Sequence, residues 1–171
     1  MAKWDNLIIA TGSQEPVGSF INCNIDSWST SINVNFISQI RFIHGLLPNR
    51  NLKDSSNPSD VMFAGGGTNN ATKDYSAYTI SKIASIKMVE LLDAEIPDTS
   101  FSILGPGWVK TKIHASTLNL KSSAGVNYFK TVKMLEEDGK KCYPIEKVIA
   151  CCNWILSSDR ALVSGRNFSS V

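Results

Sequence analysis

The chain alternates short strand-length runs with long stretches of helical periodicity. Runs at 7–10, 61–63, 100–104 and 166–169 have the length of strands, and the segments between them have helical patterns at 27–47, 76–96 and 144–157. Parallel strands joined in this way need right-handed crossovers, which place helices on both faces of the sheet. The order therefore predicts a three-layer α/β fold with a parallel sheet, in a single domain of 171 residues.

The helical segments also predict where helices begin, end and pack. Asp26 is expected to cap the first helix, and Pro97 to end the second. The second helix is expected to pack on the sheet through a stripe that excludes Tyr78 and Lys82. The apolar stripes are Trp28, Ile32, Phe36, Ile40 and Ile43 on the first helix, and Ala77, Ile80, Ala84, Met88 and Leu91 on the second. The segments 48–58 and 111–139 are polar, and we expect a loop and an irregular region there.

Composition excludes several classes of protein. The net charge of +2 comes from 17 basic and 15 acidic residues without a long run of either sign, so neither nucleic acid nor a membrane surface is expected as a partner. No stretch approaches the length of a membrane span. The four cysteines lack zinc-ligand spacing and are typical of a reducing compartment. We therefore expect a soluble cytoplasmic domain without a metal.

Two tyrosine–lysine pairs have helical spacing. In "AYTISK" (77–82), Tyr78 and Lys82 would lie one turn apart on the same helix face. The second pair, Tyr143 and Lys147, is interpreted as accidental because Pro144 directly follows the tyrosine. The first pair lies between a glycine-rich bend and a "GPGW" bend, each at the end of a strand. In a parallel sheet both bends lie at the carboxyl edge, where ligands bind.

The context of the first pair resembles the short-chain dehydrogenase/reductase family. "DYSAYTISKIASIKMVELLDAE" followed by "FSILGPGWVKTKI" is similar to the active-site helix and the next strand of that family. "DNLIIATG" (5–12) resembles its D-x-L-x-N-N-A-G strand end, and "SWSTSINVNF" resembles the helix that carries its asparagine, here Asn35. "LVSGRNFSSV" is similar to its closing strand. These elements occur in family order over nearly the whole chain.

The resemblance implies a Rossmann-type fold and hydride transfer between NAD or NADP and a carbonyl or alcohol substrate. Tyr78 would be the acid/base, Lys82 would lower its pKa and hold the nicotinamide ribose, and Asn35 would support a water in a proton relay. Alternatively, Asn35 is a buried amide that bridges two strands, and the turn at 105–107 is simply a turn. The cofactor-binding residues implied are Gly12, Tyr78, Lys82, Pro106, Gly107, Val109 and Thr111.

Two features of the chain depart from the family pattern. The family has a catalytic serine about a dozen residues before its tyrosine, and Ala64 and Gly65 in this region have no hydroxyl. Loss of such a donor typically costs about 10²–10³ in rate. Thr68 or the backbone N–H groups of 65–67 are the candidate replacements. The family fingerprint T-G-x-x-x-G-x-G is also absent, and neither 11–18 nor 65–67 fits it.

The second departure leads to an expectation about the chain as a whole. If the first strand–helix units of the family are missing, residues 1–171 form a partial Rossmann-like domain without the adenosine half of the cofactor site. Weak cofactor binding and an inactive isolated chain are then expected. The alternative is a non-catalytic remnant that serves as a structural or interaction module.

Substrate and assembly are also inferred by resemblance. The 111–139 segment would determine specificity, and its residues favour a neutral carbonyl, hydroxyl or sugar-like substrate because they form no charge cluster. The second strand, which would distinguish NAD from NADP, is not in the chain. A homodimer through the helices at 27–47 and 76–96 is expected, with Ile83 and Ile86 among the apolar residues outside the stripe.

Overall fold

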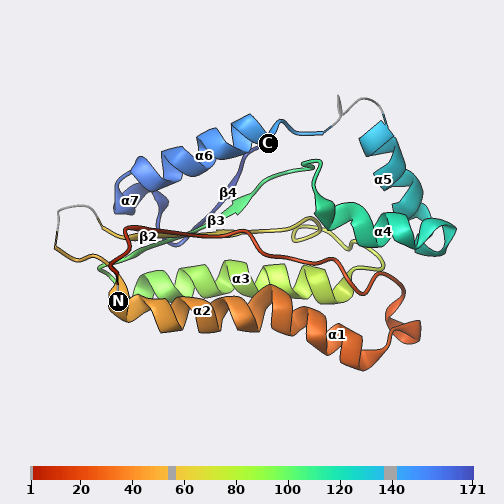
Figure 1. The fold of residues 1–171 in the computed structure, drawn as a ribbon, viewed down its shortest axis with the longest axis horizontal. Coiled ribbons are helices and arrows are strands. Elements are labelled where there is room, and N and C mark those ends of the chain that lie inside the picture. The colour runs from red at the N-terminus through yellow and green to blue at the C-terminus, as the bar shows by residue number, and fades with distance from the viewer. Residues whose placement is uncertain (1, 54–56, 137–141) are drawn as a thin grey trace.

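The computed structural model describes residues 2–53, 57–136 and 142–171. Its four strands form one parallel sheet in the order β1-β2-β3-β4, with a layer of helices on each face (Figure 1). The strands are β1 (Asn6–Ile9), β2 (Ser59–Phe63), β3 (Ser100–Gly105) and β4 (Arg166–Ser169). The α/β architecture predicted from the alternating pattern is therefore confirmed.

The helices divide between the two faces and one end of the sheet (Figure 1). One face is covered by α1 (Ile25–Ile32), a π-helical segment η2 (Asn33–Ile37), α2 (Ser38–Leu46) and α3 (Ser76–Glu95); the other is covered by α6 (Ile145–Ser157) and α7 (Arg160–Val163). The chain after β3 forms α4 (Ala115–Asn119) and α5 (Val126–Glu136) beyond the carboxyl end of the strands. Short 3₁₀ turns lie at η1 (Phe20–Asn22), η3 (Leu47–Asn49), η4 (Lys112–His114) and η5 (Lys121–Ala124).

Each face of the sheet has its own hydrophobic core. Alternate residues of a strand point to opposite faces, so Val61 packs with α6 and α7 whereas Met62 packs with α2 and α3. The first core contains Ile9, Ile43, Met62, Ala64, Val89, Leu92, Phe101 and Ile103, and the second contains Val61, Leu104, Val148, Cys152, Ile155 and Val163. Strands β2 and β3 lie between these cores and are buried except at their last residues, as expected for a sheet covered on both sides.

The buried face of α3 differs from the predicted apolar stripe. Ile80 and Leu91 of that stripe are 50% and 47% exposed, whereas the two residues placed opposite it, Tyr78 and Lys82, are buried. The buried residues are Ala77, Tyr78, Ser81, Lys82, Ser85, Val89 and Leu92. The serine hydroxyls in this set bond to carbonyls one turn earlier within the helix, at 2.7 and 3.0 Å, so they are buried at little cost. Periodicity of hydrophobicity cannot detect such a face.

The first predicted helix is present as α1, η2 and α2 in succession but differs in its details. The side chain of Asn24 accepts a hydrogen bond from the Ser27 amide at 2.9 Å, so Asn24 is the cap and Asp26 lies in the first turn. A π-helical segment at 33–37 interrupts the helix. In the predicted stripe Ile43 is buried, while Trp28 is half-buried.

The 111–139 segment is more regular than predicted, because it contains α4 and α5. The mixed composition of "VNYFKTVKMLE" (126–136) has no strong apolar stripe, which explains why the pattern did not predict α5. Residues 137–139 of this segment, and residues 54–56 of the loop predicted at 48–58, lie outside the described residues.

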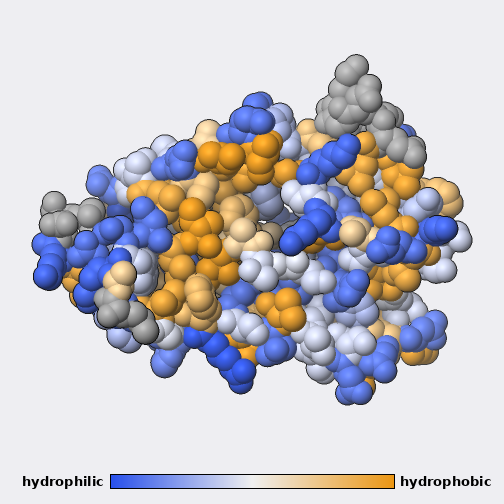
Figure 2. Space-filling view, viewed as in Figure 1, coloured by the Kyte–Doolittle hydropathy of each residue, from blue (hydrophilic) through white to orange (hydrophobic). Residues whose placement is uncertain are grey.

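The outer edge of β1 is open in the described part of the chain, where β1 pairs only with β2. Ile8 on this strand is 50% exposed, and hydrophobic residues gather beside this edge and on α6 in the view of Figure 2. An open parallel edge presents unpaired backbone groups to a partner strand. None of the described helices combines the length and hydropathy needed to cross a bilayer.

Candidate active site

Three loops meet at the carboxyl edge of the sheet. They follow β1, β2 and β3, and α3 begins at the end of the second loop. The crevice outside the carboxyl ends of parallel strands is the usual ligand site of such sheets. Most of the residues implicated by the sequence lie on these loops and on the helices that pack behind them.

Tyr78 and Lys82 lie one turn apart on the buried face of α3. Their exposed fractions are 6% and 3%, and the Lys82 Nζ lies 5.9 Å from the centre of the Tyr78 ring. The Lys82 ammonium donates a hydrogen bond to the Phe63 carbonyl at 2.8 Å. This bond joins α3 to the last residue of β2, and so fixes the lysine at the carboxyl edge of the sheet.

Burial determines the ionisation of both groups. It raises the pKa of Tyr78 to about 12 and lowers the pKa of Lys82 to about 8, because desolvation disfavours each charged form. The sequence led us to expect a Tyr78 pKa lowered by Lys82, but the desolvation of the buried phenol dominates and the pKa is raised. At neutral pH Tyr78 is therefore protonated and Lys82 is largely charged.

Gly65 lies directly against the Tyr78 phenol. A β-carbon added to Gly65 would lie 2.5 Å from the Tyr78 hydroxyl oxygen and 2.7 Å from two ring carbons. The phenol therefore fills the space in which a side chain at position 65 would begin. The candidate replacements for the absent serine lie in the turn that follows. Thr68 is half-buried there, and the same turn contains Gly66 and Gly67.

Asn35 is fully buried in the π-helical segment and bridges two parts of the chain. Its Nδ2 donates to the carbonyls of Ser13 at 2.9 Å and Ser31 at 3.0 Å, and its Oδ1 accepts from the Ser13 amide at 2.9 Å. One turn later, Gln39 donates to the Thr11 carbonyl at 2.8 Å. These bonds hold the loop after β1 against the helix layer, so the buried Asn35 amide joins a loop to a helix and not two strands as the alternative from the sequence had it.

Gly12 lies between the predicted catalytic residues. A β-carbon at this position would be 3.3 Å from the Asn35 Oδ1, 3.9 Å from the Lys82 Nζ and 3.8 Å from the Ile113 Cδ1. Asn35, Lys82 and Ile113 of η4 thus all border the same space beside the Gly12 backbone. Four of the predicted residues, Gly12, Asn35, Tyr78 and Lys82, belong to this cluster.

The turn after β3 packs in a different direction. Gly107 has a φ of 71°, and a β-carbon there would meet Val171 and Tyr143, not Tyr78 or Lys82. Val109 packs against the core on the α6 side, and Thr111 is exposed. Pro106 lies at the start of this turn and is half-buried. The structure therefore gives Gly107 and Val109 other neighbours than the Tyr78 cluster.

A polar link that the sequence did not reveal ties α4 to the site loops. The Tyr75 hydroxyl, at the start of α3, lies 2.7 Å from the Thr117 hydroxyl, which is 3.4 Å from the Gln14 side-chain oxygen. These residues come from three separate segments, so no local spacing could have indicated the link. The other Tyr/Lys pair, Tyr143 and Lys147, lies on the α6 side with an exposed lysine. No group of side chains in the described ranges could hold a metal ion.

A search against models of known families finds no match. Among curated proteins, the chain is 26% identical over 137 residues to an uncharacterized oxidoreductase of Schizosaccharomyces pombe, a match that covers 77% of this chain and 54% of that protein. The chain thus spans about half the length of the curated relative it matches.

The fold is that of solved short-chain dehydrogenases/reductases. One from Saccharomyces cerevisiae superposes with a TM-score of 0.81 at 19% identity, over 98% of this chain and 66% of that one. One from Shigella flexneri, complexed with NADP, gives 0.78 at 21% identity, over 98% and 63%. 4-Hydroxyisoleucine dehydrogenase, complexed with NADH, gives 0.71 at 17% identity, over 96% and 66%.

Proposed function

We propose that this chain is part of an NAD(P)-dependent short-chain dehydrogenase/reductase that interconverts a carbonyl and an alcohol by hydride transfer. The observation that carries the proposal is the cluster at the carboxyl edge of the sheet, in which the buried side chains of Asn35, Tyr78 and Lys82 lie around Gly12. Similar solved structures contain NADP or NADH, which supports a nicotinamide dinucleotide as the cofactor.

The residues present fit the nicotinamide end of such a cofactor. Because Gly12 lacks a side chain, backbone is exposed between Asn35 and Lys82, where a β-carbon would approach the Asn35 oxygen at 3.3 Å. Lys82 supplies an ammonium for the ribose hydroxyls, and from the turn after β3 only Pro106 and Thr111 would remain to complete the site, since Gly107 and Val109 face the α6 side. When bound, the cofactor supplies or accepts the hydride at the substrate carbon.

Tyr78 supplies the proton in this mechanism. With its pKa raised to about 12 by burial, the phenol is in its acid form and can donate to the alkoxide that develops on a reduced carbonyl. The charged Lys82, 5.9 Å from the ring centre, then stabilises the phenolate that remains. Asn35 holds the loop of Gly12 in place and would support the water that returns a proton to Tyr78.

The substrate oxygen needs a second hydrogen-bond donor, and Gly65 cannot provide a hydroxyl. Its backbone approaches the Tyr78 hydroxyl closely, since a β-carbon there would lie 2.5 Å away. The amides of residues 65–67 are therefore the donors that we assign to the oxyanion. Backbone N–H groups commonly serve this purpose.

The 171 residues are expected to bind a dinucleotide weakly by themselves. Pyrophosphate typically binds where a glycine-rich turn leads into a helix N-terminus. Neither glycine-rich stretch, 11–18 or 65–67, leads directly into an α-helix, since α1 begins at Ile25 and α3 at Ser76. The alternative of a non-catalytic module is not favoured, because the implicated side chains converge instead of lying scattered. The cytoplasm is the compartment that we propose, consistent with four free cysteines.

The experiment that tests this function follows deuterium from a cofactor deuterated at C4 of its nicotinamide ring, in the complete protein that carries this chain. We expect deuterium on the carbinol carbon of the product with wild type, and at least about a hundredfold slower turnover for Tyr78→Phe. Tyr143→Phe is the control and should stay within about twofold of wild type. Equal losses in both variants, or a product without deuterium, would refute the proposal.

A further inference from the structure

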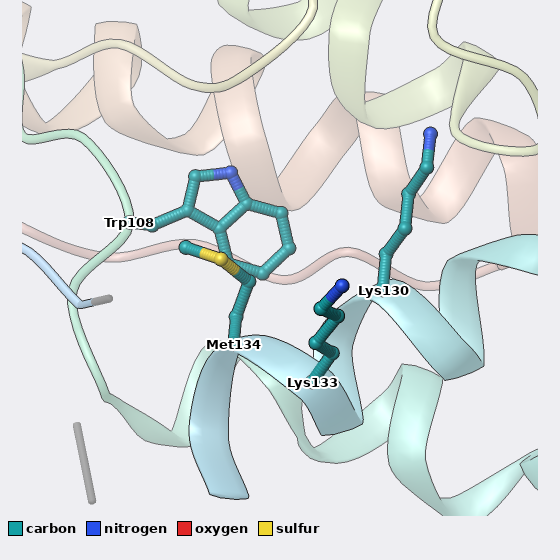
Figure 3. Close-up of a pocket in the computed structure, with 4 residues that line it drawn as sticks. All are labelled: Trp108, Lys130, Lys133 and Met134. Atoms are coloured by element: carbon teal, nitrogen blue, oxygen red, sulfur yellow. The ribbon is translucent and has the colours of Figure 1, made fainter. Parts of the chain in front are cut away.

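A hollow of about 260 Å³ lies beside the turn that follows β3. It is lined by Trp108 of that turn and by Lys130, Lys133 and Met134 of α5. In Figure 3 the Met134 thioether lies beside the indole ring, and the two lysine side chains extend from the same side of α5. The hollow therefore combines an apolar wall with two cationic groups.

The aromatic wall is held in place by its neighbours. The Trp108 ring stacks on the His114 ring with 5.0 Å between centroids and 3° between planes. The His114 Nε2 lies 3.1 Å from the Val109 carbonyl oxygen, which fixes the histidine. The Trp108 carbonyl accepts a hydrogen bond from the Tyr143 amide at 2.7 Å. Trp108 is nevertheless 40% exposed, so its ring is fixed but remains accessible to a ligand.

The opposite wall, α5, is anchored as well. Asn127 is buried and donates to the Lys73 carbonyl at 3.2 Å, and Thr131 one turn later is also buried. The thiol of Cys142 donates to the Met134 carbonyl at 3.3 Å. Since both walls are held by residues outside the hollow, its shape exists before a ligand arrives. Preformed sites lose less entropy when they bind.

The hollow carries two basic groups on one face of α5. Lys130 and Lys133 are exposed and lie three residues apart on that helix. Neither forms an ion pair with any residue that the structure describes, and the described residues that line the hollow include no acidic side chain. An anion that binds both lysines would gain charge-assisted hydrogen bonds.

The hollow is connected to the Tyr78 cluster through η4. Ile113 approaches the space beside Gly12 that Lys82 also borders, since its Cδ1 would be 3.8 Å from a β-carbon there. The next residue, His114, carries the stacked Trp108 ring. A molecule in the hollow therefore lies next to the segment that closes over the site.

We propose that Lys130 and Lys133 bind a carboxylate on the substrate, with an aromatic or other apolar body against Trp108 and Met134. This inference rests on the proposed function, because it assigns the substrate class of the same site. It replaces the neutral substrate favoured by the sequence with an oxo or hydroxy acid. Local spacing does not indicate this site, because Lys130 and Lys133 line a hollow only together with Trp108, which is more than twenty residues away in the chain.

Benzoylformate and its methyl ester provide the test, since they share a ring and a carbonyl and differ in charge. Calorimetric titration at low ionic strength should show benzoylformate binding about tenfold more tightly than the ester. Lys130→Ala/Lys133→Ala should reduce that preference to about twofold or less. The matched control, Lys3→Ala/Lys87→Ala, removes the same charge from two exposed positions and should keep the preference. The preference should also weaken with added salt.

The binding measurement separates this inference from the proposed function. If wild type binds benzoylformate through the lysines but no deuterium transfer occurs, the inference stands and the function fails. Equal affinity for acid and ester, no detectable binding of the acid, or an acid preference that survives the double substitution overturns the inference. The inference is also overturned if the double substitution lowers the affinity for reduced nicotinamide mononucleotide and leaves the affinity for benzoylformate unchanged, because the lysines would then bind a cofactor phosphate.

Discussion

The close approach of Gly65 to Tyr78 shows how one residue constrains its neighbours. The phenol hydroxyl would lie 2.5 Å from a β-carbon at position 65, which is shorter than any ordinary contact. The phenol is buried and its helix is packed, so it cannot move away without disturbing α3. The Tyr78 phenol can therefore occupy this position only because residue 65 has no side chain.

Gly65→Ser should consequently destabilise the protein and not supply the serine that the related enzymes have. We expect the midpoint of thermal unfolding to fall, with a loss of about 1–3 kcal/mol typical of overpacking. Gly66→Ser is the control, because nothing lies within 4 Å of a β-carbon there. Calorimetry of both variants checks this, and a Gly65→Ser protein as stable as Gly66→Ser would contradict the packing described.

Among the secondary-structure elements, the sequence predicted which helices and strands exist and in what order better than it predicted which face of a helix is buried. The strands at 59–63 and 100–105 and the helix at 76–95 lie within two residues of their predicted bounds, because apolar runs and Pro97 mark them clearly. The buried face of α3 was predicted wrongly, since its small serines and Lys82 are satisfied by bonds that no hydrophobic pattern encodes. The site cluster was found through motifs, whereas the Tyr75–Thr117 link depends on tertiary contact.

Strand β2 contains a buried carboxyl group that makes stability depend on pH. Asp60 is 0% exposed, its strand neighbours are Leu7 and Phe101, and neither of its oxygens has a hydrogen-bond partner among the residues that the structure describes. Burial raises its pKa from 3.8 to about 8. The folded state therefore binds a proton that the unfolded state releases between these two pKa values. Stability from this group is fully present below about pH 4 and is lost as the pH rises towards about 8.

Asp60→Asn should remove this pH dependence. In urea unfolding, the free energy of unfolding of wild type should fall by up to about 1.4 kcal/mol per pH unit relative to the variant across that window. Asp5→Asn, at an exposed position, serves as the control and should follow wild type. Parallel curves for wild type and Asp60→Asn would show that Asp60 does not titrate in this way.

At the scale of the whole molecule, the face formed by α2 and α3 remains the proposed dimer contact. Exposed apolar residues lie on both helices, including Phe42 at 54%, Ile80 at 50% and Ile83 at 41%. Ile86, which the sequence also suggested, packs against the first core and is not available. An exposed apolar surface of this kind typically marks an interaction site.

We expect sedimentation at micromolar concentrations to show a homodimer that Ile83→Glu converts to a monomer, because a charge would be buried without a partner. Ile149→Glu is the matched control on α6, where Ile149 is 52% exposed, and should leave the dimer intact. A monomeric wild type, or dissociation caused by Ile149→Glu alone, would show that α2 and α3 do not form the contact.

The proposed function requires these residues to hold the nicotinamide end of a cofactor beside Tyr78 and Lys82. Titration of residues 1–171 with reduced nicotinamide mononucleotide and with NADH tests this requirement. We predict dissociation constants within about threefold of each other, and weaker binding of both after Lys82→Ala, because the residues assigned to the cofactor would hold only the half that the two ligands share. NADH binding more than about tenfold tighter than the mononucleotide, or affinities unchanged by Lys82→Ala, would contradict the claim.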